Sequence, residues 1–186
     1  MSTQPPAKST ETETTEPRLY VGTYAKYTAG SIKGAWLTLT DYADKDDFLT
    51  ACRELHKDEA DPELMFQDFE NMPKALYSES VCPDLWEILS ECQRHGVEIE
   101  TLAAYVDAGM GDWDDVNLCA DAFRGSFRNA EDFAEHLCED CGTLNEVPEY
   151  LRGYFNMSAY ARDLFMGGDF SEVDDPTGGI LVFSNH

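Results

Sequence analysis

The sequence predicts an α+β protein made of three small units in a row, the first α+β, the second helical and the third α+β. Short apolar runs bounded by Gly, Pro, Asn and Asp occur near both ends of the chain and are typical of strands. Apolar residues at helical spacing, separated by glycines, fill the middle. We place the units at residues 18–72, 73–122 and 123–186.

The first unit is predicted to form a small sheet covered by one helix. Two strands, Leu19–Tyr24 and Ser31–Leu39, are separated by a glycine-containing turn. Asp44 is a good N-cap for a helix that runs to about Lys57, and Leu64–Phe69 follows as a third strand. The expected buried face of the helix consists of Phe48, Leu49, Cys52 and Leu55.

Three helices are predicted in the middle unit. Pro83 suits the first position of a helix that ends at Gly96, because a helix start needs no N–H there and glycine readily adopts the left-handed terminal conformation. A second helix covers roughly Glu98–Ala108, and a third runs from near Asp112 to about Ala122.

The third unit combines strands with two helices. Phe123–Phe127 is predicted as a short strand before a helix over residues 129–142. A further helix covers about Ser158–Met166. Phe170–Val173 and Ile180–Phe183 then form a hairpin.

The helix over residues 129–142 has an unusual charge pattern. Asn129 is a good N-cap and Gly142 a natural terminator. The apolar stripe consists of Ala130, Phe133, Ala134, Leu137 and Cys141. Two rows without Lys or Arg lie opposite, namely Glu131, Glu135, Glu139 and Asp132, His136, Asp140. Like charges four residues apart cost a helix about 0.2–0.5 kcal/mol per pair, and carboxylates in the last turn oppose the helix dipole. Selection for stability alone does not explain this face.

The charge of the whole chain is strongly negative and unevenly placed. The net charge is -24, and Lys and Arg are absent from His95 to Phe123 and from Asn129 to Leu151. Solubility of a small domain requires only about 2–8 charges. Such a charge repels nucleic acid and anionic membranes, so we expect a basic protein surface as partner. The carboxylates expected to bind it are Glu98, Glu100, Asp107, Asp112, Asp114, Asp115, Asp121, Glu131, Asp132, Glu135, Glu139 and Asp140.

The N-terminal residues and the cysteines indicate the cellular setting. Residues 1–17 are rich in Thr, Pro and Glu and are expected to form a disordered tail. No apolar run approaches the roughly 18 residues that span a bilayer, and the N-terminus lacks the apolar core of a signal peptide. Six cysteines without such a signal are typical of reduced thiols, so we expect a cytoplasmic protein.

Two motifs suggest a metal site, but neither is complete. His136, Cys138 and Cys141 form an HxCxxC pattern, yet one Cys-x-x-Cys pair without a second is poor support for structural zinc. Asp112, Asp114 and Asp115 resemble the start of a calcium loop whose glycine and closing glutamate are missing. Catalytic motifs such as Gly-x-Ser-x-Gly and His-Glu-x-x-His are absent, so we assign no catalytic residue, metal or cofactor.

Several segments resemble the ArdA-type antirestriction proteins of conjugative plasmids and transposons. The most specific are LYVGTYAKYTAGSIKGAWLTL (19–39), CRELHKDEADPELMFQDFE (52–70), EDFAEHL (131–137) and YARDLF (160–165). The resemblance extends from about Arg18 to Phe183, and the seventeen-residue tail departs from the family pattern.

This resemblance implies an elongated chain of three domains that forms a curved homodimer and mimics bent DNA. Its carboxylates would imitate phosphates and occupy the DNA groove of the methyltransferase core of type I restriction–modification enzymes. Incoming plasmid or transposon DNA would thereby be protected. The family's antirestriction motif, which is linked to dimer contacts, corresponds to about Ala130–Asp140.

The amount of charge agrees with mimicry. At two phosphates per base pair, a net charge of -24 corresponds to about 12 base pairs per chain and about 24 per dimer. Three other interpretations stay open: an acidic surface adapted to salt, an acidic metal-binding protein, and a metal-dependent hydrolase that uses clustered Asp and Glu. A hydrolase would lose activity with EDTA or one Asp→Asn substitution, whereas a mimic would lose affinity gradually.

Overall fold

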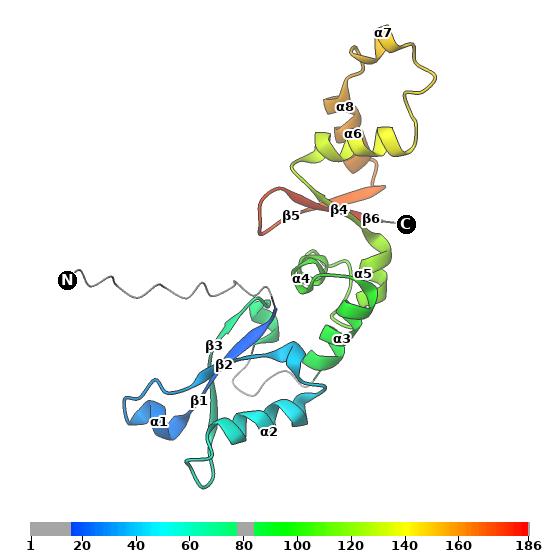
Figure 1. The fold of residues 1–186 in the computed structure, drawn as a ribbon. Coiled ribbons are helices and arrows are strands. Elements are labelled where there is room, and N and C mark those ends of the chain that lie inside the picture. Colours follow the sequence, from blue (N-terminus) through cyan, green and yellow to red (C-terminus); the bar gives the residue numbers. More distant parts are fainter. Residues whose placement is uncertain (1–15, 78–83, 186) are drawn as a thin grey trace, which may run out of the picture. The chain divides into compact units, whose positions relative to one another are not determined.

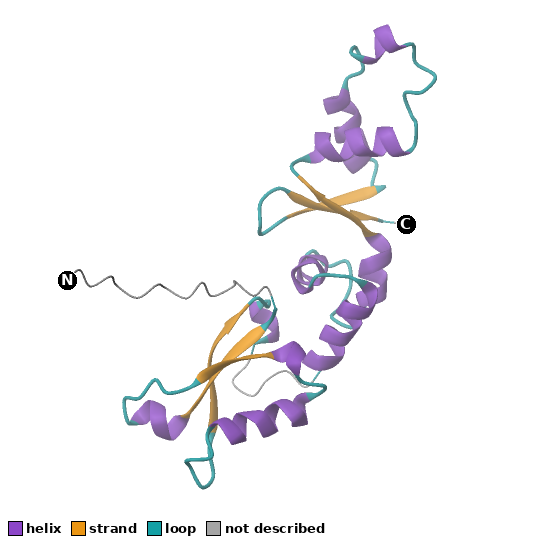
Figure 2. Ribbon diagram, viewed as in Figure 1, coloured by secondary structure: helices purple, strands orange, loops and turns teal. Residues whose placement is uncertain are grey.

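The computed structural model describes residues 16–77 and 84–185 and divides the chain into two compact units, Met1–Pro83 and Asp84–His186 (Figure 1). Most of the predicted tail lies outside the described residues, and so does Pro83, the predicted helix start. Within the described residues, eight α-helices and two three-stranded antiparallel sheets make up an α+β fold, as predicted (Figure 2). The division into three domains stays a prediction.

The first sheet is built around β1 (Arg18–Thr23), which pairs with β2 (Ala35–Thr38) on one side and β3 (Leu64–Glu70) on the other. Both neighbours run antiparallel to β1. Leu19 and Val21 of the central strand are at most 1% exposed, because strands and a helix cover them. All three predicted strands are therefore present.

The connection between β1 and β2 differs from the prediction. A short helix, α1 (Tyr24–Thr28), follows β1 directly, and the Thr23 hydroxyl accepts a hydrogen bond from the Lys26 N–H at 3.3 Å. Residues 31–34, predicted as strand, form a loop that passes close to β1. A Cβ atom on Gly34 would lie 2.3 Å from the Val21 carbonyl oxygen, so this approach requires glycine.

The helix α2 (Lys45–Leu55) packs on the first sheet. The Asp44 carboxylate accepts a hydrogen bond from the Asp47 N–H at 2.9 Å, which confirms the predicted N-cap. Phe48 is fully buried and stacks on Phe66 of β3, with 5.9 Å between the ring centroids. This contact joins the helix to the sheet.

The predicted buried face of α2 is correct for Phe48 and Cys52 but wrong for Leu55, which is 38% exposed. Leu55 is the last helical residue, and His56 turns inward after it and is 2% exposed. A histidine buried this deeply needs hydrogen-bond partners inside the protein for both ring nitrogens.

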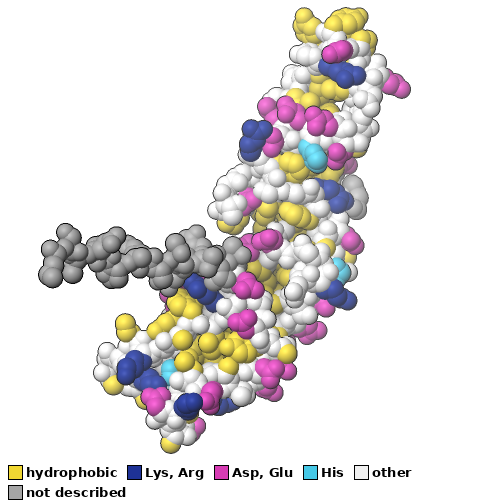
Figure 3. All heavy atoms as spheres, viewed as in Figure 1, with side chains coloured by type: hydrophobic (Ala, Val, Ile, Leu, Met, Phe, Trp, Pro, Cys, Tyr) yellow, Lys and Arg dark blue, Asp and Glu magenta, His cyan; other side chains and the backbone are white. Residues whose placement is uncertain are grey.

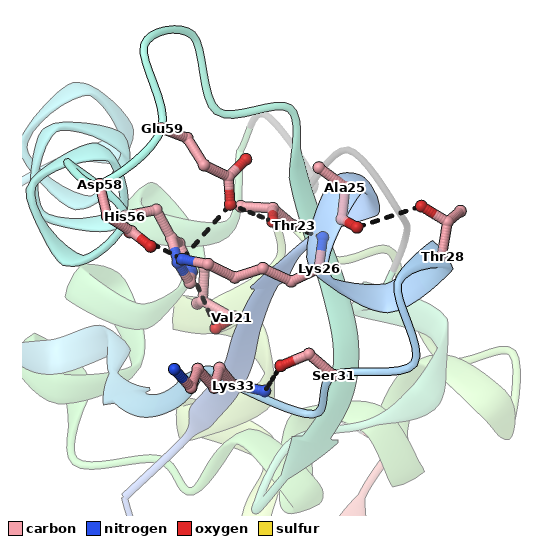
Figure 4. A network of polar contacts seen from close by, with 10 residues as sticks. All are labelled: Val21, Thr23, Ala25, Lys26, Thr28, Ser31, Lys33, His56, Asp58 and Glu59. Atoms are coloured by element: carbon pink, nitrogen blue, oxygen red, sulfur yellow. Dashed lines mark hydrogen bonds and ion pairs between the residues drawn. The ribbon is translucent and has the colours of Figure 1, made fainter.

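Lys26 provides one of these partners (Figure 4). Its Nζ lies 2.8 Å from His56 Nδ1. The same ammonium lies 2.8 Å from Asp58 Oδ1 and 3.3 Å from Glu59 Oε1. An ammonium group only donates, so Nδ1 accepts, and Nε2 carries the ring proton toward the Val21 carbonyl oxygen, 3.2 Å away. This network ties α1 to the loop that follows α2.

The second unit begins with three helices, α3 (Leu85–His95), α4 (Ile99–Asp107) and α5 (Val116–Ala122). Gly96 ends α3 with φ of +68°, as predicted for a left-handed terminator. Buried residues from all three helices, such as Leu102, form their shared core. None of the helices in the described ranges is long and apolar enough to cross a membrane.

The helix α5 begins later than predicted, because residues 112–115 form a turn. The Asp115 carboxylate accepts a hydrogen bond from the Asp112 N–H at 2.9 Å and so closes this turn before the first helical residue. A Cβ atom on Gly111 would lie 2.6 Å from the Tyr105 ring, so the chain must have glycine at this approach. The Asp115 carboxylate therefore closes the turn, and the approach to Tyr105 leaves no room for a side chain at residue 111.

The second sheet has the order β4 (Phe123–Phe127), β6 (Ile180–Ser184) and β5 (Phe170–Asp174), all antiparallel. The predicted strand and hairpin are thus confirmed. Phe183 of the central strand is fully buried and lies 5.5 Å from the Tyr105 ring of α4, measured between centroids. The middle helices and the C-terminal sheet belong to one compact unit. The predicted domain border at residue 122 stays a prediction.

Two longer helices accompany this sheet, α6 (Ala130–Asp140) and α8 (Met157–Met166), with the short α7 (Glu149–Arg152) between them in sequence. The buried Phe133 ring of α6 lies 5.7 Å from Phe165 of α8 and 4.9 Å from Phe170 of β5, measured between centroids. This aromatic cluster fixes α6 against its neighbours.

Replacing Lys26 with methionine is expected to destabilise the protein at neutral pH, because Asp58, Glu59 and the buried His56 lose their charged donor. The hydrogen bond from Lys26 holds the pKa of Asp58 below its ordinary value of 3.8. Above that value the ion pair contributes fully, and its contribution is lost as pH falls through the lowered pKa.

The difference in urea midpoint between wild type and Lys26→Met should therefore shrink as pH falls below about 4. Lys57→Met is the matched control, because the Lys57 side chain is 74% exposed and pairs only with the exposed Glu54 among the described residues. A difference in midpoint that stays constant with pH would contradict this assignment.

Candidate functional site

The twelve carboxylates predicted to bind a partner all lie in the second unit, mostly at its surface. Three of them, Glu100, Asp115 and Asp132, are half-buried. The exposed ones are Glu98, Asp107, Asp112, Asp114, Asp121, Glu131, Glu135, Glu139 and Asp140. Figure 3 shows acidic side chains gathered over α6. The largest coherent group is therefore the one on α6.

The helix α6 is held in place by its caps and its apolar face. Asn129 Oδ1 accepts a hydrogen bond from the Asp132 N–H at 2.9 Å, and Gly142 follows the helix with φ of +64°. Both predicted ends are confirmed. Because backbone and core fix this helix, its carboxylates have a defined spacing along the axis.

The predicted apolar stripe of α6 is wrong at one residue, Cys141. Cys141 is exposed, because it lies after the last helical residue, where the chain turns away. Cys138 is 5% exposed and packs in the core instead. Four carboxylates of the opposite face remain exposed, and no basic residue occurs in the last turn.

Asp132 differs from the other acidic residues of α6, because Arg128 pairs with it from just before the helix. Arg128 Nε lies 3.1 Å from Asp132 Oδ1, and this hydrogen bond holds the pKa of Asp132 below its ordinary value. The chain thus compensates one of the predicted charges itself. The four-residue spacing could have revealed this pair in the sequence.

The three potential ligands of the HxCxxC motif are not brought together as a cluster. His136 Nε2 lies 3.3 Å from Asp140 Oδ2, one turn along the helix, while Cys138 is buried and Cys141 is exposed. In the described part of the chain, three potential metal ligands come within 4.8 Å of one another at two other places only.

The first of these clusters consists of His56, Asp58 and Glu59, and the Lys26 ammonium already lies among their ligand atoms. The second consists of Asp112, Asp114 and Asp115, which the turn before α5 brings together. In that turn the Asp115 carboxylate is hydrogen-bonded to the backbone. Local structure accounts for both clusters.

Three of the cysteine thiols are buried and unreactive. Burial raises the pKa of the Cys52 thiol to about 12 and the pKa values of Cys92 and Cys119 to about 11. These thiols stay protonated and are poor nucleophiles. Burial also raises the pKa of the Glu100 carboxyl, which lies in the first turn of α4. Among the carboxylates predicted to bind a partner, desolvation thus disfavours the charged form of Glu100.

Comparisons with known proteins agree with the residues that carry the resemblance. A family model described as "Antirestriction protein (ArdA)" matches residues 19–177, which is most of the chain. A comparison with curated protein sequences gave no match.

The acidic end of α6 should cost the protein stability. Replacing Glu139 with glutamine removes a like charge four residues from Glu135 and a negative charge from the end of the helix dipole. We expect the free energy of unfolding to rise by about 0.3–0.5 kcal/mol in urea titrations.

Asn129→Ala is the control in the same helix and should lower the free energy of unfolding by about 1 kcal/mol, because the N-cap is lost. A lower stability of Glu139→Gln would show instead that Glu139 has a favourable partner.

Proposed function

The chain belongs to the ArdA antirestriction protein family, and on this premise we propose that it is a DNA mimic that inhibits type I restriction–modification enzymes. It binds the DNA groove of the methyltransferase core as a homodimer and acts in the cytoplasm. It is an inhibitor and not an enzyme. Incoming plasmid or transposon DNA is protected while the groove is occupied.

The exposed acidic face of α6 is the observation that carries this proposal. Four exposed carboxylates fall within Glu131–Asp140, a stretch that rises about 1.5 Å per residue, so about one exposed charge occurs per 4 Å. One DNA strand has a phosphate about every 3.4 Å. The Asn129 cap and the buried Phe133 hold the helix backbone in place, so little backbone conformational entropy is lost on binding.

Inhibition follows from competition for a basic groove. A groove that binds DNA presents Lys and Arg side chains toward phosphates, and carboxylates at similar spacing can pair with them. Binding releases the anions condensed on the groove, so affinity falls as salt rises. The charge far exceeds what solubility needs and repels nucleic acid, which keeps the inhibitor from binding DNA itself.

The first test is a competition assay with purified type I methyltransferase, a labelled target duplex and the full chain at two salt concentrations. We expect DNA to be displaced at near-stoichiometric protein, with weaker displacement at the higher salt. A fully active enzyme that keeps its DNA at both salt concentrations would rule the proposed function out.

The same assay measures how much each exposed carboxylate of α6 contributes to inhibition. Changing one exposed carboxylate, such as Glu131→Gln, should weaken inhibition less than about threefold, because an exposed charge pair contributes little. Changing Glu131, Glu135, Glu139 and Asp140 together should weaken it far more and reduce the salt dependence.

Asn129→Ala serves as the control for that series, because it loosens α6 without changing its charge. If a single exposed carboxylate of α6 abolished inhibition in a folded protein, the charge would not be distributed as proposed.

A further inference from the structure

A cavity of about 490 Å³ lies between α3 and the turn that precedes α5. We propose that this cavity binds a guanidinium or ammonium side chain of the partner, with arginine as the best fit. The inference rests on the proposed function and deepens it, because it adds one specific pocket to a surface otherwise read as distributed charge.

The floor of the cavity is apolar. Ile88 of α3 is 6% exposed and Val116 of α5 is 1% exposed, so neither side chain is free to move out of the way. Arg and Lys carry aliphatic stems that pack on apolar surface while the charged head stays at the rim. A purely anionic or purely apolar ligand would match only half of this lining.

The wall of the cavity contains Trp113, whose indole is half-buried. Tryptophan is the best aromatic partner for a cation, and a planar guanidinium also stacks on it. Residues 112–115 present Trp113 because they form a turn and not the predicted helix. Asp115 closes that turn and Gly111 fits under Tyr105, so the wall is preformed.

The rim of the cavity is acidic. Three of its carboxylates, Asp84, Glu87 and Asp114, are exposed, and the fourth, Glu91, is half-buried. Within the described residues only Glu91 of these four forms an ion pair, with Arg94 and with His95 at 3.7 Å. The other three carboxylates have no ion-pair partner among the described residues and are placed to pair with a cationic group from outside.

An apolar floor, an aromatic wall and an anionic rim together fit one kind of occupant, a cation with an apolar stem. Such pockets receive the side chains that dominate an interface, in which Arg is enriched. Substitutions here should therefore weaken inhibition about tenfold, whereas a single exposed carboxylate elsewhere has a small effect.

Two variants of the full chain test the pocket in the competition assay. Trp113→Leu removes the aromatic face but keeps an apolar side chain, and Glu87→Gln changes one exposed carboxylate at the rim. Glu172→Gln is the matched control, because it makes the same chemical change at an exposed residue that lies outside the cavity and is not one of the twelve predicted binding carboxylates. Both pocket variants should lose about tenfold in inhibition and the control at most about threefold. If wild type displaces DNA and all three variants behave alike, the pocket is wrong and the proposed function stands.

A second measurement does not depend on the enzyme. The indole N–H signal of Trp113, assigned with Trp113→Leu, is followed by NMR as N-acetyl-arginine amide is added. The neutral isostere N-acetyl-citrulline amide is the control. A shift with arginine alone supports the pocket even if wild type fails to displace DNA. Equal shifts with both compounds, no shift, or a shift with Mg²⁺ in place of arginine would overturn it.

Discussion

Repulsion among carboxylates is the constraint that both units of this protein have to overcome in order to fold. Bringing together a chain with a net charge of -24 raises its electrostatic free energy. Burial of apolar side chains does not depend on charge and offsets this cost. The most buried aromatic residues, Phe48, Phe133 and Phe183, are at most 2% exposed, and burying each contributes roughly 1.5–3 kcal/mol.

Two of the few basic side chains, Lys26 and Arg128, compensate the charge of neighbouring carboxylates. Lys26 holds two carboxylates and the buried His56 in the first unit, and Arg128 pairs with Asp132 at the start of α6. The later turns of α6 contain no Lys or Arg, and their carboxylates stay exposed. Unfavourable charge is thus concentrated on one rigid face, where a basic partner would relieve it. Part of the binding affinity would then come from relief of the repulsion that these carboxylates exert on one another in the free protein.

The acidic surface and the cavity around Trp113 would act at different distances from the partner. The field of many carboxylates reaches about a Debye length, roughly 8–10 Å at physiological salt, and speeds the encounter with a basic groove. The pocket around Trp113 acts only on contact, when a side chain enters it. A mimic built from both elements would combine rapid association with a slower release.

Much of this architecture could be predicted from the sequence, because it depends on neighbours along the chain. The caps Asp44 and Asn129, the terminator Gly96 and the acidic rows of α6 are all local patterns. Local pattern also led to errors at helix ends. Leu55 and Cys141 have the right spacing for burial, but the chain turns away there and leaves both side chains exposed.

Only the tertiary structure decided the contacts between residues far apart in sequence. His56 contacts Lys26 across thirty positions in the sequence. Trp113 lines one cavity with Glu87 and Glu91 of α3, because the Asp115 carboxylate closes a turn where a helix was expected. Spacing along the chain carries no information on such encounters, since they depend on how packed elements bring side chains together. The sequence by itself therefore determined the charge and the local elements, and packing decided which charges are compensated and where a cavity forms.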